Sequence, residues 1–89
     1  MKAVITVIGH DKVGIIYKVS GLLAEAKINI LDISQTIMQN MFTMIMLVDT
    51  KEATESVEEI SKKLNSLGEE MGLSMRIQHE DVFNSMHRI

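Results

Sequence analysis

Hydrophobic residues along this 89-residue chain follow two different spacings, and the order of these spacings limits which folds the chain can adopt. Four stretches have the composition and spacing of β-strands: 3–8, 28–38, 41–48 and 73–78. Two further stretches repeat their apolar residues every three or four positions, as amphipathic helices do: 14–26 and 53–71. This order predicts the α+β class and a ferredoxin-like βαββαβ sandwich, in which a four-stranded antiparallel sheet carries two helices on one face.

The first helical stretch has a single apolar stripe, formed by Ile15, Ile16, Val19, Leu22, Leu23 and Ala26. Gly21 interrupts this stretch, and a glycine inside a helix costs about 1 kcal/mol relative to alanine. We therefore expect another part of the molecule to pack closely against Gly21.

Turn and cap residues predict where the later elements begin and end. Gln39 and Asn40 suit a two-residue turn, because asparagine tolerates a positive φ, so the two middle strands are expected to form a hairpin. Asp49 and Glu52 have the spacing of a capping box, which predicts that the second helix starts near them. Gly72 is expected to end that helix.

The composition excludes several classes of function. Because the chain has no cysteine, it cannot form a disulfide, bind an iron–sulfur cluster or use thiol catalysis. A formal net charge of −3 and only three aromatic residues argue against nucleic-acid binding, which favours a basic surface with stacking side chains. No apolar stretch is long enough for a membrane span and the N-terminus is unlike a signal peptide, so we expect a cytoplasmic protein without a membrane partner.

The most specific local feature is the loop Gly9-His10-Asp11-Lys12-Val13-Gly14, which joins the first strand to the first helix. Gly14 leaves the first N–H groups of the helix uncovered by a side chain. These groups carry the positive end of the helix dipole, so they suit a carboxylate or a phosphate. The alternative is that the two glycines only make a tight strand-to-helix connection.

Other uses of this fold lack their residues here. An RNA-recognition domain needs aromatic residues on the middle strands, and a metal chaperone needs a Cys-x-x-Cys loop. An acylphosphatase-like enzyme needs an arginine in the loop, where Lys12 is the only cation. His10 and His79 are expected at opposite ends of neighbouring strands, which argues against a metal pair. We therefore expect no enzyme, no metal and no cofactor, but a small-molecule regulatory module.

Two short motifs resemble those of the ACT domain family. The run Gly9-His10-Asp11-Lys12-Val13-Gly14-Ile15 is similar to the family motif of an acidic residue, a basic residue, proline and glycine before a helix. Asn29-Ile30 matches the Asn-Ile that opens the second strand in that family. Val13 departs from the motif, because it stands where the family usually has proline. The resemblance extends over nearly the whole chain and points to stand-alone ACT proteins, the glycine-cleavage repressor type and the N-terminal domain of formyltetrahydrofolate deformylase.

This resemblance implies a ligand site between two subunits, for an amino acid or a similar small metabolite. One wall would be the loop of one subunit, with Asp11, Lys12 and the backbone from Val13 through Gly14 to Ile15. The other wall would be Asn29 and Ile30 of its neighbour. Two plainer roles remain open here: Asp11 as the N-cap of the first helix, and Asn29 as no more than the start of a strand.

Association is expected, because the sheet face without helices carries apolar residues that a single domain would expose to water. The predicted partners are thus a second copy, in a homodimer or a higher oligomer, an amino acid ligand and a possible protein target. A tail at 80–89 follows the expected ACT domain at 1–79, and its apolar residues are predicted to dock: Val82, Phe83, Met86 and Ile89. Two functions remain open: a regulatory protein that modulates a metabolic enzyme or regulator, and a homo-oligomeric interaction module without a functional ligand site.

Overall fold

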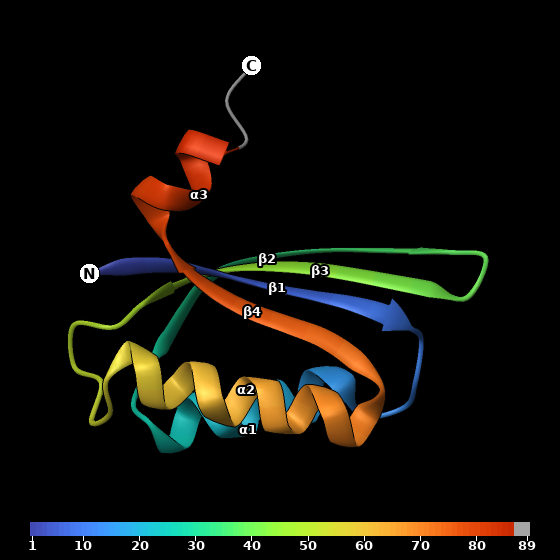
Figure 1. The fold of residues 1–89 in the computed structure, drawn as a ribbon, viewed down its shortest axis with the longest axis horizontal. Helices are drawn as coiled ribbons and strands as arrows, with labels where there is room; N and C mark the ends of the chain where they lie inside the picture. Colours follow the sequence, from blue (N-terminus) through green and yellow to red (C-terminus); the bar gives the residue numbers. More distant parts are fainter. Residues whose placement is uncertain (87–89) are drawn as a thin grey trace.

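The computed structural model describes residues 1–86 of the chain. Its elements are β1 (Lys2–His10), α1 (Ile15–Glu25), β2 (Asn29–Met38), β3 (Met41–Asp49), α2 (Val57–Met71), β4 (Leu73–His79) and α3 (Glu80–Met86) (Figure 1). The first six elements have the predicted order, so the ferredoxin-like α+β sandwich is confirmed.

The four strands form one sheet in the order β2-β3-β1-β4, and every neighbouring pair is antiparallel. Helices α1 and α2 lie on one face of this sheet, whereas α3 lies on the opposite face (Figure 1). Strands β1 and β2 run in the same direction, because both are antiparallel to β3. Strand β2 has a neighbour on one side only, and it is therefore an edge of the sheet.

The core lies between the sheet and the two long helices. Burial alternates along β3, as expected for a strand with one face in the core. Side chains that lie fully buried there include Ile5, Val7, Val19, Leu23, Met44, Met46, Val48, Ile60 and Leu64. Two of the eight methionines thus lie in the core, where their flexible side chains adapt to the space between the sheet and the helices.

Both predicted chain reversals are confirmed. Gln39 and Asn40 have φ values of 52° and 69°, which the two central residues of a tight hairpin turn require. Gly72 has a φ of 71° and caps α2 in the left-handed conformation, which ends the helix.

The predicted start of the second helix is wrong. Asp49 ends β3, and its carboxylate accepts a hydrogen bond of 2.9 Å from the backbone N–H of Lys51, so it shapes a turn instead of a helix. The capping box is formed by Ser56 and Glu59, and α2 begins at Val57. Glu59 accepts hydrogen bonds from the backbone and the hydroxyl of Ser56, which lower the pKa of its carboxyl.

The expectation for Gly21 is also wrong. A Cβ added to Gly21 would meet no atom within 4 Å, so no part of residues 1–86 packs against it. The helical glycine that permits a close approach is Gly68 in α2, which is buried. A Cβ there would lie 2.5 Å from the carbonyl oxygen of Leu73, the first residue of β4.

The tail forms helix α3 directly after β4 and packs on β1 and β4. Val4 points to this face of the sheet, since its neighbours Ala3 and Ile5 face the core, yet it is 5% exposed. We infer that α3 covers Val4. Phe83 is half-buried, the outer residues Val82 and Met86 are exposed, and Ile89 lies outside the described residues.

Deletion of residues 80–89 is expected to lower the free energy of unfolding by about 1–2 kcal/mol, because the side chain of Val4 becomes exposed to water. Urea unfolding followed by circular dichroism would measure the change. Identical unfolding curves for the truncated and full chains would contradict a stabilising role for the tail.

Candidate functional site

The loop after β1 leaves the start of α1 open. Gly14 is the N-cap with a φ of 91°, none of the described side chains caps the helix, and its first turn has no acidic residue. The alternative role of Asp11 as N-cap is therefore wrong. Instead, the backbone N–H of Asp11 donates a 2.8 Å hydrogen bond to the carbonyl of Asn40, which holds the loop against the hairpin turn. The first N–H groups of α1 thus remain available to an anion.

The other predicted loop residues have different surroundings. The side chain of Val13 is completely exposed, at 103% of its reference area. Ile15 is 2% exposed and belongs to the core, so it can offer a ligand only its backbone. The ammonium of Lys12 lies 3.4 Å from the place a Cβ would take on Gly72, beside the C-terminus of α2. The negative end of that helix dipole favours a cation, which gives Lys12 a structural role.

The two glycines of the loop serve different purposes. A Cβ on Gly9 would collide with the side chain of Leu73, so Gly9 permits β1 and β4 to approach each other. A Cβ on Gly14 would meet nothing within 4 Å. Gly14 is therefore required by its positive φ alone, and the space above it is free.

Asn29 is far from this loop in the same chain. It is the first residue of β2 and pairs with Asp49, which in turn pairs with Lys2 at the start of β1. The loop follows His10 at the other end of β1, roughly 25–30 Å away at about 3.3 Å per residue. One chain alone therefore does not bring the two predicted walls together.

A polar pocket of about 300 Å³ surrounds Asn29. It is lined by Lys27, Asn29, Asp49, Lys51 and Glu52. The hydrogen bond from the backbone of Lys51 lowers the pKa of the Asp49 carboxyl, and the N-terminal ammonium 3.7 Å away acts in the same direction. Asn29 is exposed, so its side-chain amide can reach a molecule that approaches the edge of the sheet.

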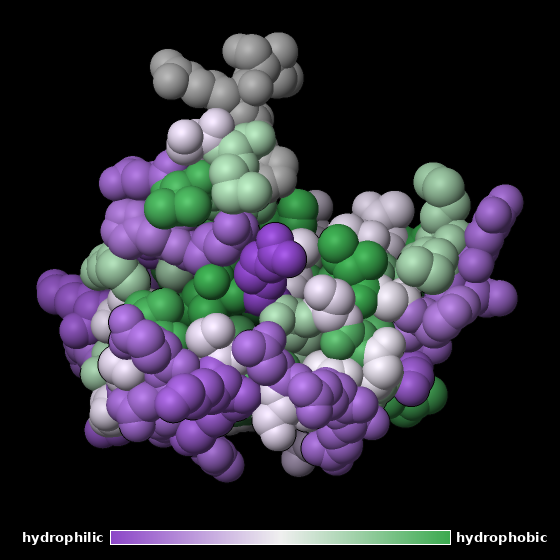
Figure 2. All heavy atoms as spheres, viewed as in Figure 1, coloured by the Kyte–Doolittle hydropathy of each residue, from purple (hydrophilic) through white to green (hydrophobic). Residues whose placement is uncertain are grey.

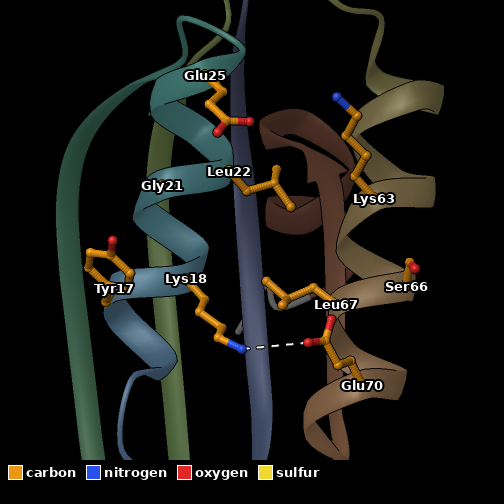
Figure 3. A pocket seen from close by; sticks show the side chains of 9 residues that line it. All are labelled: Tyr17, Lys18, Gly21, Leu22, Glu25, Lys63, Ser66, Leu67 and Glu70. Atoms are coloured by element: carbon orange, nitrogen blue, oxygen red, sulfur yellow. Dashed lines mark ion pairs between the residues drawn. The ribbon is translucent and has the colours of Figure 1, made fainter.

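A larger hollow lies elsewhere, between the outer surfaces of α1 and α2, and has a volume of about 530 Å³ (Figure 3). The sequence pattern did not predict this groove, although a glycine in the middle of α1 was a signal that this position is unusual. The ammonium of Lys18 on α1 and the carboxylate of Glu70 on α2 form an ion pair of 3.5 Å across it. At the other end, Lys63 bonds to Glu55 at 2.7 Å, which raises the pKa of Lys63.

The sheet face opposite to α1 and α2 carries exposed apolar residues, as predicted. Ile8, Met41 and Ile45 are 42%, 42% and 39% exposed. Figure 2 shows apolar side chains on the surface between α3 and the tip of the β2–β3 hairpin. Association through this face stays a prediction.

Neither a cluster of metal ligands nor a membrane-spanning helix is found among residues 1–86. His79 pairs with Ala3 and His10 pairs with Met41, so the two histidines lie at opposite ends of β1, as expected. Residues 1–86 contain no group of three His, Asp or Glu side chains that could hold a metal ion. Among the same residues, no helix has both the length and the apolar character needed to cross a bilayer.

Comparison with known proteins places this geometry in a family. Residues 2–78 match the family described as ACT domain. A UPF0237 protein of Clostridium acetobutylicum is 58% identical over 89 residues, which span the full length of both chains. An ACT domain protein from Streptococcus pneumoniae has a TM-score of 0.80 and 38% identity, and the match covers 93% of each chain.

The two more specific resemblances are also confirmed. A candidate glycine cleavage system transcriptional repressor has a TM-score of 0.75 at 27% identity, over 86% of this chain and 44% of that one. A formyltetrahydrofolate deformylase from Burkholderia mallei has a TM-score of 0.79 at 14% identity, over 88% of this chain and 28% of that one, and shares the fold. With its family match, its full-length relative and its loop motif, this chain belongs to the ACT domain family.

Proposed function

We propose that the chain acts in the cytoplasm as a small regulatory protein that binds an amino acid or a similar metabolite between two copies of itself and modulates a metabolic enzyme or regulator. An ACT domain suggests a small regulatory, ligand-binding module. The single observation that carries the proposal is the open N-terminus of α1 behind Gly14, where no described side chain accepts from the first N–H groups. Residues 1–79 would form the binding domain and 80–89 an appended tail.

The β2 edge is our choice for the contact between copies, because it combines unpaired backbone with exposed apolar side chains. Ile33 and Ile37 pair with Met46 and Phe42, which face the helices, so they lie on the same side of the sheet. Both are exposed, at 41% and 56%. Ile16 is also exposed, on the flank of α1 opposite to α2. A second copy beside β2 would bury these three residues.

Antiparallel pairing of two β2 edges would complete the site. Because β1 and β2 run in the same direction, the end of β2 lies at the same side of the domain as the loop after β1. A twofold axis between the copies places the start of one β2 beside the end of the other. The partner's Asn29 and the partner's Ile30 would then lie beside Asp11 and Gly14.

Such an arrangement has the chemistry to bind an amino acid. The first N–H groups of α1 would donate hydrogen bonds to the ligand carboxylate, and the exposed carboxylate of Asp11 would accept hydrogen bonds from the ligand ammonium. The partner's Asn29 offers both a donor and an acceptor, while Val13 and the partner's Ile30 provide apolar surface. Lys12 would act indirectly, because its ammonium lies at the end of α2.

The experiment is a thermal shift screen with glycine and the common L-amino acids, since a ligand of the folded state must raise the melting temperature. Calorimetry on the best of these compounds then compares the variants. Asn29→Ala is expected to weaken binding by about 1–3 kcal/mol, because a buried polar group of the ligand loses its partner. Asp11→Ala should affect the amino acid more than its analogue without the amino group.

Asn65→Ala is the matched control, since Asn65 is an exposed residue of α2, away from the proposed walls and from the β2 edge. It should leave the affinity unchanged. If no compound raises the melting temperature, the alternative function gains support: an oligomeric interaction module whose ligand site has been lost. If a compound binds but Asn29→Ala and Asp11→Ala leave its affinity intact, the assigned site is wrong.

A further inference from the structure

A third pocket lies on the sheet face that α1 and α2 leave uncovered, beside α3. It has a volume of about 210 Å³, and its lining comes from β1, β4 and α3: Thr6, Ile8, Ser74, Arg76, Gln78 and Met86. Arg76 and Thr6 lie directly opposite each other in neighbouring strands, and Ser74 and Gln78 stand two residues to either side of Arg76. These four side chains therefore share one face of the sheet.

The charge of this pocket differs from that of the other two. In the groove between α1 and α2, and in the pocket around Asn29, lysines stand beside carboxylates. Among residues 1–86, Arg76 is the only charged residue that lines the third pocket. Its guanidinium forms no ion pair and no hydrogen bond with any of these residues. In a chain with a net charge of −3, this pocket thus holds a positive charge that no described carboxylate balances.

Hydrogen-bonding groups and apolar groups surround this guanidinium on different sides. The hydroxyls of Thr6 and Ser74 can each donate a hydrogen bond to an anion. The side-chain amide of Gln78 donates a 3.3 Å hydrogen bond to the sulfur of Met86, which links α3 to the sheet at this point. The pocket therefore combines a polar floor on the sheet with an apolar wall formed by Ile8 and Met86.

We propose that this pocket binds a small monocarboxylate that carries a short apolar group. The guanidinium of Arg76 donates two parallel hydrogen bonds to the carboxylate, and the hydroxyls of Thr6 and Ser74 donate to its remaining lone pairs. Ile8 and Met86 contact the apolar group. A single guanidinium balances one negative charge, so a monocarboxylate fits the pocket better than a phosphate monoester, which carries roughly two at neutral pH.

This site is separate from the proposed amino acid site. Strands β4 and β2 are opposite edges of the sheet, so a contact between copies through β2 leaves the pocket open. Gly14→Val should therefore leave binding in this pocket unchanged, and Arg76→Gln should leave binding at the start of α1 unchanged. Failure of one site is thus measured independently of failure of the other.

Titration of the full chain with isovalerate, followed by NMR of the backbone amides, tests the site. We expect saturable shifts in the amide signals of Thr6, Ser74 and Arg76. Arg76→Gln should weaken binding by roughly tenfold or more, because the charge-assisted hydrogen bonds are lost. Lys62→Gln removes an equal charge from the exposed surface of α2 and should leave the affinity unchanged. Absence of saturable shifts, or equal affinity of the wild type and folded Arg76→Gln, would overturn the proposal.

Two further probes test the chemistry of the ligand. Isovaleramide has the same apolar group without the charge and should bind roughly tenfold more weakly than isovalerate or not at all. Ethyl phosphate should also bind more weakly, and tighter binding of this probe would overturn the assignment to a monocarboxylate. Met86→Ala should weaken isovalerate binding several-fold, because the wall on α3 loses apolar contact with the probe. Unchanged affinity of this variant would contradict the role of α3 in the site.

Discussion

Replacement of Gly68 by alanine is expected to lower the free energy of unfolding by about 1–3 kcal/mol, as overpacking of a closed site does. The new Cβ would lie 2.5 Å from the carbonyl oxygen of Leu73, which is backbone and cannot move independently of β4. Helix α2 and β4 must therefore shift apart, and the packing of Met75 against Gly68 shifts with them. For a domain of 89 residues this is a large fraction of the total stability.

The matched control is Gly21→Ala, which makes the same chemical change in the middle of the other long helix. Because its Cβ meets no neighbour, only the helix preference of alanine acts, and we expect a gain of up to about 1 kcal/mol. Urea unfolding in dilute solution, where copies do not associate, gives both values. Equal effects of the two substitutions would contradict the difference in packing between α1 and α2.

Gly14→Val is expected to abolish ligand binding. The valine side chain would stand in the open space in front of the first N–H groups of α1, where the carboxylate of the ligand is proposed to lie. It would also have to adopt a φ of 91°, which disfavours a β-branched residue, so the loop should distort. Calorimetry with the ligand found by thermal shift measures the loss.

Loss of ligand binding by Gly14→Val has to be distinguished from unfolding of the variant. A side chain at position 14 would not displace the buried core residues next to the loop, such as Ile15, because the space around Gly14 is open. The variant should therefore remain folded, with a melting temperature lowered by the strain of the positive φ. Circular dichroism and the assembly mass provide this control. Binding by folded Gly14→Val with wild-type affinity would show that the carboxylate does not lie at the start of α1.

Most of the fold could be predicted because the turn and cap residues agreed with the helices and strands that the spacing of apolar residues indicates. The spacing of apolar residues in β3 and α2 matched their buried faces, and both Asn40 and Gly72 had the backbone conformation that their type suggests. The predicted start of α2 was wrong because two pairs of residues with the spacing of a capping box lie within about ten residues of each other. Asp49 and Glu52 have the right spacing, but the carboxylate of Asp49 bonds to the next turn, and Ser56 caps the helix instead.

The residues of the candidate site stay a prediction, and what the sequence did not predict is that one chain keeps them far apart. The loop motif located Asp11 and Gly14, and the start of β2 located Asn29. In one chain, the loop and Asn29 lie at opposite ends of β1. This separation depends on how the strands pair in the sheet. The roles of Gly21 and Gly68 could not be distinguished, because a glycine in a helix looks the same whether it faces a strand or open space. Only the neighbours of each Cβ separate them.

The most direct test of the shared site combines two defective chains. Gly14→Val removes the loop wall and Asn29→Ala removes the strand wall, so a heterodimer of the two has one site with both defects and one intact site. Half of the dimers in an equal, co-refolded mixture are heterodimers, so calorimetry should find about a quarter of the wild-type sites, at wild-type affinity. Complete absence of high-affinity sites in the mixture, with heterodimers confirmed by mass spectrometry, would contradict a ligand site built between two copies.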